Sequence, residues 1–301
     1  MAPAFKVRFG LGLGTTNVLG EPSAFAALVD RLEELRFDSL WISERATGPT
    51  LDPLTALAFA AGRTRRLKLG TSVLVVPGRN PVLLAKELAT VDVLSGGRLL
   101  PAFGLGTPDP REHQAFGVDR GERAAWFEEA VPLIRRLWRE DTVSHAGPRF
   151  PLTDVSLWPK PVGRMEVWLG GRTTKEFDRV GRHGQGWLGA FQTPSEAGRA
   201  RQAIDEAAAR YDRAVDDDHY GTVLLYARGA IDPRVQERIA RVQPAAALAD
   251  VVPTGAEELR ALVARYVEQG LSKFVLVPAA KPAVWDDELA WLAPIVREME
   301  T

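Results

Sequence analysis

Three residues carry side chains that could perform acid–base or electrostatic chemistry. Glu44 and Arg45 follow the apolar segment 39–43, and a carboxylate beside a guanidinium could hold a small polar molecule or stabilise developing negative charge. An ordinary ion pair on the surface would explain the same two residues. His113 is the one of the four histidines that we expect near a strand end, where an imidazole could exchange a proton. We therefore predict Glu44, Arg45 and His113 as catalytic candidates.

Glycine-rich segments form a second group of candidates, because glycine allows the backbone to approach a ligand closely. Gly170 and Gly171 precede Arg172 and Thr173 at the predicted start of a helix, where free amides and the helix dipole favour a phosphate. An ordinary strand–helix turn with a threonine cap would use the same residues. The other small residues that we expect beside a ligand at strand ends are Gly12, Gly104, Gly106 and Thr107.

Composition and charge exclude several classes of protein. The 301 residues include no cysteine, which excludes disulfides, thiolate metal sites and a cysteine nucleophile. The histidines lack the spacing of metal ligands, so we predict no metal site. A net charge of −1 favours neither nucleic acid nor a membrane surface, and no apolar run reaches the roughly 20 residues that span a bilayer. Lys6 and Arg8 stand where a signal peptide would be apolar, so we expect a soluble, cytoplasmic protein.

Predicted strands and helices, which would hold these candidate residues in place, alternate along the whole chain. Residues 67–76 form an apolar, β-branched run, Asn80-Pro81 starts an amphipathic helix, and residues 98–106 form the next strand. Two buried strands joined by a helix are parallel and connected with a right-handed crossover. Residues 107–119 are expected to be a polar loop. The eight predicted strands are residues 7–14, 39–43, 67–76, 98–106, 166–169, 185–190, 221–227 and 273–277.

Eight strands, each followed by a helix, predict an α/β protein and, within that class, a single (β/α)₈ TIM barrel spanning residues 1–301. A doubly wound open sheet is the alternative. Residues 141–165 break the alternation with prolines and short apolar pieces, so we predict an insertion after the fourth helix that contains a hairpin. Because the active site of a barrel lies at the carboxyl ends of its strands, all the candidates above would gather there.

Several motifs make the chain resemble the luciferase-like monooxygenase family, and within it the enzymes that use the deazaflavin coenzyme F420. The resemblance runs over nearly the whole chain. The motifs that carry it are FDSLWISER at 37–45, RLKLGTSVLVVPGRNPVLLAKELATVDVLSGGRL at 66–99, GLG at 104–106 with EHQAFGV at 112–118, WPKPV and VWLGG between 158 and 171, and VPTGAEELRALVARYVEQGLSKFVLV at 252–277.

The resemblance implies an oxidoreductase that transfers a hydride between F420 and a small organic substrate. It implies a cis peptide bond between Ser72 and Val73 behind the deazaflavin ring, a phosphate-binding turn at residues 170–173, and a homodimer. Cations near the mouth would meet the acidic tail of F420, and the candidates are Arg79, Arg172 and Lys281. Two alternatives stay open: an FMN-dependent monooxygenase supplied by a separate reductase, and a flavin-binding protein without catalysis.

One departure from the family pattern concerns the second strand. Many relatives end it with an acidic residue followed by histidine, whereas this chain has Glu44 followed by Arg45. We therefore predict that Arg45 binds an anionic part of the substrate or cofactor. Glu44 would orient Arg45 or act as the proton donor.

Overall fold

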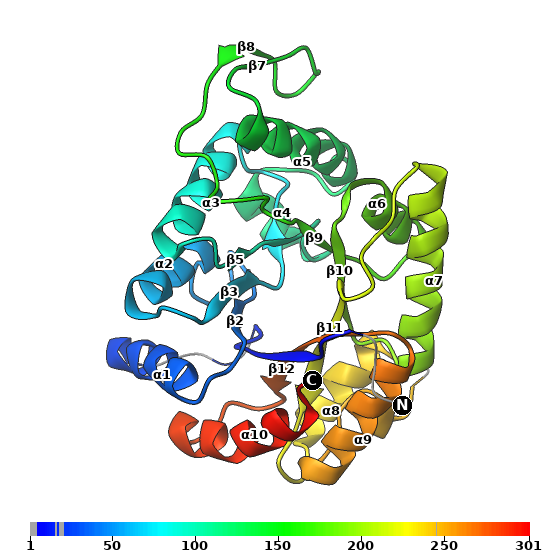
Figure 1. Ribbon diagram of the computed structural model, residues 1–301. Helices are drawn as coiled ribbons and strands as arrows, with labels where there is room; N and C mark the ends of the chain where they lie inside the picture. Colours follow the sequence, from blue (N-terminus) through cyan, green and yellow to red (C-terminus); the bar gives the residue numbers. More distant parts are fainter. Residues whose placement is uncertain (1–4, 16, 18–20, 245) are drawn as a thin grey trace.

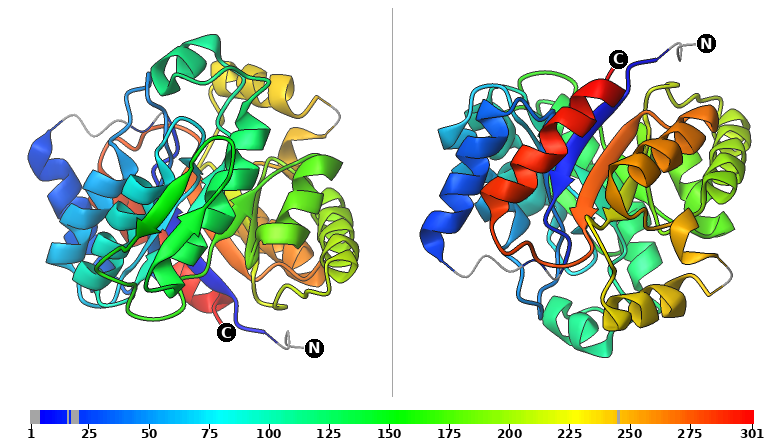
Figure 2. Two further views of the ribbon diagram at one scale, coloured as in Figure 1. Left: turned by 90° about the horizontal axis from the view of Figure 1, so that it is seen from above. Right: turned by 90° about the horizontal axis from the view of Figure 1, so that it is seen from below.

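The computed structural model of the chain describes residues 5–15, 17, 21–244 and 246–301. Ten parallel strands form one curled sheet, and helices pack around its outer side (Figures 1 and 2). The strands lie in the order β4-β6-β9-β10-β11-β12-β1-β2-β3-β5. Their bounds are β1 (Arg8–Gly12), β2 (Ser39–Ile42), β3 (Lys68–Thr71), β4 (Leu74–Val75), β5 (Leu99–Leu100), β6 (Ala102–Gly104), β9 (Trp168–Gly170), β10 (Gly186–Ala190), β11 (Tyr220–Tyr226) and β12 (Lys273–Pro278).

The described part of the chain contains ten α-helices and one short 3₁₀ turn at Leu248–Asp250. Most begin with an Asp, Asn or Thr cap followed by proline or a first-turn glutamate, as helix starts require. No helix in these residues has the length and apolar character needed to cross a membrane. The helices are α1 (Pro22–Glu34), α2 (Pro53–Arg63), α3 (Pro81–Ser95), α4 (Pro110–Phe116), α5 (Arg123–Arg139), α6 (Thr174–His183), α7 (Pro194–Arg210), α8 (Pro233–Val242), α9 (Gly255–Glu268) and α10 (Trp285–Met299).

The curl of the sheet follows from its pairing. β1 lies between β2 and β12, so the first and last strands of the sequence are neighbours. β3 pairs with β5, and β4, which directly follows β3, pairs with β6. The amide of Val7 also donates a 3.0 Å hydrogen bond to Oγ1 of Thr301, which places the two ends of the described fold side by side (Figure 2).

Two strands that we predict to be continuous are each interrupted once. The first break lies between β3 and β4, where the peptide bond Ser72-Val73 is cis, as the family resemblance implies. The second lies at Pro101, which has no amide hydrogen to donate to a sheet ladder. Thr71 fills this gap, because its Oγ1 donates to the carbonyl of Ala102 and accepts from the amide of Ala102, at 2.8 and 2.9 Å.

Apolar side chains pack on both sides of the curled sheet. The larger core lies between the sheet and the helices, and a smaller cluster around Trp41 and Trp168 fills the inside of the curl. Neighbouring glycines make room for these indole rings. A Cβ atom on Gly70 would lie 2.3 Å from the ring of Trp41, and one on Gly186 would lie 2.5 Å from the ring of Trp168. The interior of the sheet is therefore filled with side chains rather than open.

A buried charge cluster joins the amino ends of three strands. Asp38, just before β2, pairs with Lys273 of β12 at 2.6 Å and with Lys68 of β3 at 3.0 Å. Burial alone would raise the pKa of Asp38, but the two ammonium groups outweigh it and lower that pKa to about 2. Burial lowers the pKa of Lys273. These three charged side chains therefore lie at the amino ends of the strands, at the opposite end of the sheet from the candidate site.

Two segments outside the strand–helix alternation differ in how well the sequence predicts them. The predicted hairpin in residues 141–165 is present as β7 (Val143–His145) and β8 (Leu152–Val155), an antiparallel pair outside α5 (Figure 1).

The prediction of a loop at residues 107–119 is wrong, because α4 lies within it. Its start is set by Asp109, whose side chain accepts from the Arg111 amide at 3.0 Å. With seven residues, α4 is too short to show a helical pattern of apolar side chains.

Candidate functional site

Val73 projects between two glycines at the carboxyl ends of the strands. Gly104 and Gly170 are the last residues of β6 and β9. A Cβ atom on Gly104 would lie 2.4 Å from Val73 Cγ2, and one on Gly170 would lie 3.1 Å from Val73 Cγ1. Three positions that we predict to contact a cofactor therefore meet at one place. Glycine is required at position 104 because Val73 packs against it.

Val73 belongs to a group of apolar side chains on the inside of the curl. Val73, Val223 and Leu225 are partly exposed and pack against the cluster inside the curl. Gly12 lies at the carboxyl end of β1, and a Cβ atom there would lie 2.7 Å from Val277 Cγ2. The floor of the site is thus formed by branched aliphatic side chains, which suits the flat face of an apolar ring.

Glu44 supports this floor from the end of β2. Its Oε2 accepts a 2.6 Å hydrogen bond from the amide of Val75, and its Oε1 pairs with the guanidinium of Arg79. The side chain is only 6% exposed, and burial raises the pKa of Glu44 despite the nearby Arg79. Both carboxylate oxygens accept hydrogen bonds, so Glu44 positions the segment after the cis bond. The prediction that it orients Arg45 is wrong, because its charged partner is Arg79.

Arg45 points to α4 instead. Its Nη2 lies 3.3 Å from Asp109 and its Nε 3.4 Å from Glu112. Glu112 is buried and also accepts from the amides of Ala46 and Thr47, at 3.0 and 2.9 Å. Arg45 and Glu112 therefore fasten the loop after β2 to α4, with two carboxylates facing one guanidinium.

His113 lies on the inner side of α4, beside the loop after β6. Its Nε2 is 3.1 Å from the carbonyl of Thr107. Arg123 donates to the same carbonyl at 2.7 Å and to that of Leu105 at 3.0 Å. Between them, Gly106 has a φ of +81°, a conformation that favours glycine. Sequence reasoning missed Arg123, because an arginine at a helix start carries no motif that links it to a loop 16 residues earlier.

The predicted phosphate turn is already closed by a carboxylate. Oε2 of Glu176 accepts from the amides of Arg172 and Thr173, at 2.7 and 2.9 Å, and from the Thr173 hydroxyl at 3.0 Å. A Cβ atom on Gly171 would lie 2.5 Å from Cβ of Glu176, so this glycine is needed for the cap. The expectation that these amides are free is therefore wrong. The reason is a capping box between Thr173 and Glu176, in which the glutamate carboxylate occupies the amides that we assigned to a phosphate.

The three cations predicted near the mouth differ in their surroundings. Arg79 is held by Glu44. Arg172 is exposed, and its Nη2 is 3.4 Å from the carbonyl of Val242 at the end of α8. Lys281 is exposed in the segment after β12. Two of the three are thus accessible to an anionic group.

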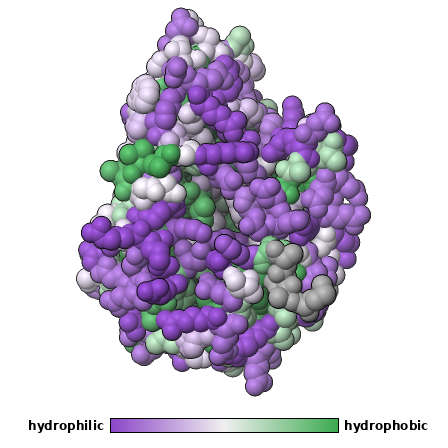
Figure 3. Space-filling view, viewed as in Figure 1, coloured by the Kyte–Doolittle hydropathy of each residue, from purple (hydrophilic) through white to green (hydrophobic). Residues whose placement is uncertain are grey.

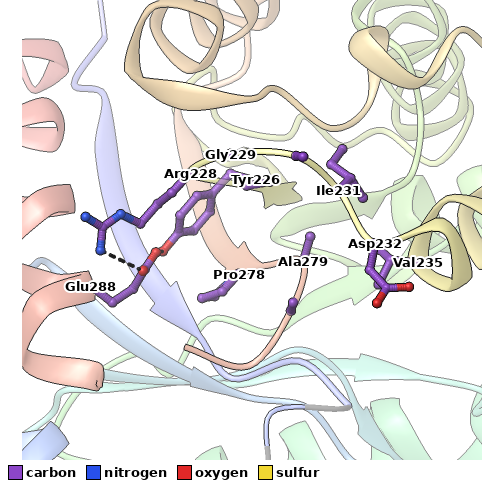
Figure 4. Close-up of a pocket in the computed structure, with 12 residues that line it drawn as sticks. Tyr226, Arg228, Gly229, Ile231, Asp232, Val235, Pro278, Ala279 and Glu288 are labelled. Carbon is purple, nitrogen blue, oxygen red and sulfur yellow. Dashed lines mark hydrogen bonds and ion pairs between the residues drawn. The ribbon is translucent and has the colours of Figure 1, made fainter. Parts of the chain in front are cut away.

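A cavity of about 170 Å³ opens at the ends of β11 and β12 (Figure 4). At one end the Tyr226 hydroxyl donates to Glu288 at 2.8 Å, and Arg228 lies 3.5 Å from the same carboxylate. Ile231 and Ala279 belong to its apolar wall (Figure 4). Sequence analysis missed this cavity because alanine, glycine and isoleucine in loops carry no recognisable signature.

One group of metal-ligand type lies far from these residues in the fold, before β9 and β11. Glu166, Asp216 and His219 bring their donor atoms within 4.8 Å of one another. Their positions before the strands place them at the amino ends, away from Val73. The sequence shows no metal motif here because the group forms only when two distant segments meet, one with Glu166 and one with Asp216 and His219.

Comparison with known proteins identifies the class to which this site belongs. The model of the luciferase-like monooxygenase family matches residues 5–271. The chain belongs to this family.

Two curated relatives are 32% identical to the chain. One is an F420-dependent glucose-6-phosphate dehydrogenase of Intrasporangium calvum, matched over 62% of this chain and 60% of that protein. The other is a putative coenzyme F420-dependent oxidoreductase of Mycobacterium tuberculosis, matched over 68% and 61%. The matches thus span about three fifths of the length of these relatives.

Solved structures share the fold over nearly the full chain. The monooxygenase RslO1 of Streptomyces bottropensis superposes with a TM-score of 0.79 at 23% identity, over 97% of this chain and 99% of that one. An F420-dependent secondary alcohol dehydrogenase superposes with a TM-score of 0.80 at 19% identity, over 97% and 100%. At these identities the likeness describes the fold.

Proposed function

We propose that the protein is an oxidoreductase that transfers a hydride between coenzyme F420 and a small organic substrate. The observation that carries the proposal is the apolar surface around Val73, in a chain whose curated relatives bear the names of F420-dependent enzymes. A flat ring would lie on Val73, Val223 and Leu225, and no side chain projects from Gly104 or Gly170 to obstruct it. When bound, the deazaflavin supplies the redox chemistry, and the protein supplies position and electrostatics.

The residues that would hold F420 fall into two groups. A phosphate at residues 170–173 would replace the Glu176 carboxylate on the amides of Arg172 and Thr173, so an anion already marks that place. Arg172 and Lys281, the two exposed cations, would face the acidic tail, and Arg79 would add its positive charge from within its ion pair with Glu44. The positions proposed to contact the ring are Gly12, Ser72, Val73, Gly104, Gly106 and Thr107.

For proton transfer we propose His113. A carbonyl only accepts hydrogen bonds, so Nε2 of His113 donates to Thr107, and in the neutral ring Nδ1 keeps its lone pair. A His113→Gln variant keeps a donor to Thr107 but has no imidazole to exchange a proton. It is expected to lower kcat at least tenfold while keeping cofactor affinity. Turnover equal to that of wild type would exclude His113.

Arg45 is proposed to attract an anionic part of the substrate or cofactor. Its Nε makes no hydrogen bond among the described residues, and its side chain is 26% exposed. Arg45→Ala is expected to weaken binding of the anionic ligand severalfold, and Arg111→Ala, which removes the exposed partner of Asp109, serves as the control. Turnover and cofactor affinity of Arg45→Ala equal to those of wild type would contradict this role.

We also propose the finer architecture. Counting β3 with β4 and β5 with β6 as one strand each reduces ten strands to eight, which then close as a (β/α)₈ barrel through the β1–β12 and β4–β6 pairs. Residues 1–301 would form this one domain, with 141–165 as an insertion after the fourth barrel helix. The cytoplasmic location stays a prediction from the sequence.

A second copy of the chain is proposed to cover α3, which gives a homodimer. Leu83 and Leu94 are 63% and 66% exposed on this helix, and Trp158 and Val162 lie next to it with similar exposure. In Figure 3, apolar side chains gather on the side of the molecule where α3 lies. Sedimentation of wild type and a Leu83→Glu, Leu94→Glu variant tests this proposal.

The alternative is an FMN-dependent monooxygenase served by a separate reductase. Titration of the protein with F420 and with FMN, followed by tryptophan fluorescence, separates the two. F420 is expected to bind at least tenfold more tightly, and Val73→Asp to abolish that binding by placing a charge on the apolar floor. Tighter FMN binding would favour the monooxygenase, and binding of neither cofactor would overturn both.

A further inference from the structure

Four arginines converge at the amino ends of β9 and β10, on the side of the sheet opposite the proposed active site. Arg135 and Arg139 lie near the end of α5, Arg164 lies before β9, and Arg213 lies after α7. We call these four residues the arginine cluster. Arg135 and Arg213 are partly buried, while Arg139 and Arg164 are exposed.

Hydrogen bonds fix the two inner members of the cluster beside each other. Arg213 donates to the carbonyls of Gly181 and Gly184, the latter at 2.6 Å. Arg135 donates to the side chain of Gln185, the next residue in the chain. Oε1 of Gln185 also accepts from the Val167 amide at 3.0 Å, three residues after Arg164. Arg135 and Arg213 therefore meet just before β10, and Arg139 and Arg164 are close enough for their charges to act on Arg135.

The surrounding arginines show what is missing from the cluster. Arg136, Arg182 and Arg210 each lie within 3.7 Å of a carboxylate, namely Glu140, Glu128 and Asp178. Within the described ranges, no carboxylate lies within 4 Å of any member of the arginine cluster, and the charged groups that act on Arg135 are the other three arginines. Nε of Arg135 is buried and makes no hydrogen bond in this part of the structure.

Unbalanced like charges of this kind are unfavourable when partly removed from water. Burial and the three neighbouring guanidinium groups lower the pKa of Arg135 to about 9, far from the usual value of an arginine. Burial, and to a smaller extent the charge of Arg164, also lowers the pKa of Arg213. A bound anion with several negative charges would balance the cluster. Planar guanidinium groups match the oxygens of phosphate, with two parallel hydrogen bonds per arginine.

We propose that the arginine cluster binds a multiply charged oxyanion of the phosphate type. The accessible guanidinium groups of Arg139 and Arg164 contact the anion, and Arg135 and Arg213 supply positive charge beneath them. The site is separate from the turn at residues 170–173, which follows β9 and lies at its carboxyl end.

The proposal is tested by comparing inorganic phosphate with sodium chloride at equal ionic strength. Thermal unfolding measures their effect on the melting temperature, and calorimetric titration measures their binding. Phosphate is expected to raise the melting temperature, whereas chloride is not. Arg139→Ala with Arg164→Ala is expected to weaken phosphate binding at least tenfold without changing F420 binding. Arg199→Ala removes an exposed arginine of α7 and serves as the matched control. Arg135 and Arg213 are left intact because they hold carbonyl and amide groups of the fold.

Two results would overturn the proposal. One is equal stabilisation by phosphate and chloride. The other is wild-type phosphate affinity in the double variant, and loss of that affinity in Arg172→Ala would then assign phosphate to the mouth instead.

Discussion

Glu44 accepts a 2.6 Å hydrogen bond from the amide of Val75, a residue 31 positions later in the chain. The carboxylate thereby joins the segment after β2 to β4, beyond the cis peptide bond that precedes Val73. The side chain that forms the centre of the apolar floor is therefore held by a buried carboxylate. This carboxylate is in turn balanced by Arg79.

Replacing Glu44 is expected to affect stability and cofactor binding together. Glu44→Ala leaves the Val75 amide without its acceptor, and an unsatisfied buried donor costs roughly 1–3 kcal/mol. Glu44→Gln keeps an acceptor for Val75 and is expected to lose less than half as much. Denaturant unfolding of both variants, with F420 titration, measures this. Equal stability of wild type and Glu44→Ala would show that the hydrogen bond is unimportant.

The contact between Gly104 and Val73 predicts a compensating pair of substitutions. Gly104→Ala puts a methyl group 2.4 Å from Val73 Cγ2 and is expected to destabilise the fold by about 1–3 kcal/mol through overpacking. Val73→Ala removes the obstructing methyl groups, so the double variant is expected to be more stable than the sum of the single effects. Gly170→Ala, with 3.1 Å to Val73 Cγ1, is the milder control. Strict additivity would contradict the proposed packing.

The Asp38 cluster predicts a loss of stability in acid. The pKa of Asp38 is about 2 in the folded protein and near 3.9 in an unfolded chain, so its stabilising effect is complete above pH 4. This effect is lost as the pH falls towards 2, and amounts to roughly 2–3 kcal/mol.

The matched variant for this prediction is Asp38→Asn, which leaves Lys273 buried without its partner and is expected to destabilise by about 3–5 kcal/mol at pH 7. The difference from wild type should shrink between pH 4 and pH 2, measured by urea unfolding. A constant difference over that range would mean that Asp38 does not titrate as described.

Two capping boxes of the same type allow the proposed phosphate turn to be tested with an internal control. Thr173 and Glu176 form the box at the start of α6, and Thr193 and Glu196 form the box at the start of α7. Glu176→Gln removes the negative charge that competes with a phosphate and is expected to tighten F420 binding about fivefold, the equivalent of roughly 1 kcal/mol. Glu196→Gln is expected to leave it unchanged. Unaltered affinity in Glu176→Gln would place the phosphate elsewhere.

Local sequence patterns are sufficient to predict the alternation of strands and helices and the family. Apolar strand segments alternating with capped helices are local patterns, and the motif at residues 66–99 also located the cis bond at Ser72-Val73. The hairpin in residues 141–165 was likewise visible as a break in that rhythm.

Which side chains meet becomes clear from the three-dimensional arrangement of the elements. Glu44 finds Arg79 rather than its neighbour Arg45, because adjacent residues at a strand end point in different directions and the partner comes from another element. Glu176 closes the turn that seemed open to phosphate. Glycines that looked like places for a ligand make room for valines. The Glu176 contact is a local capping box, which the prediction of a phosphate turn overlooked. The other contacts join segments far apart in the chain, and local sequence patterns do not contain such distances.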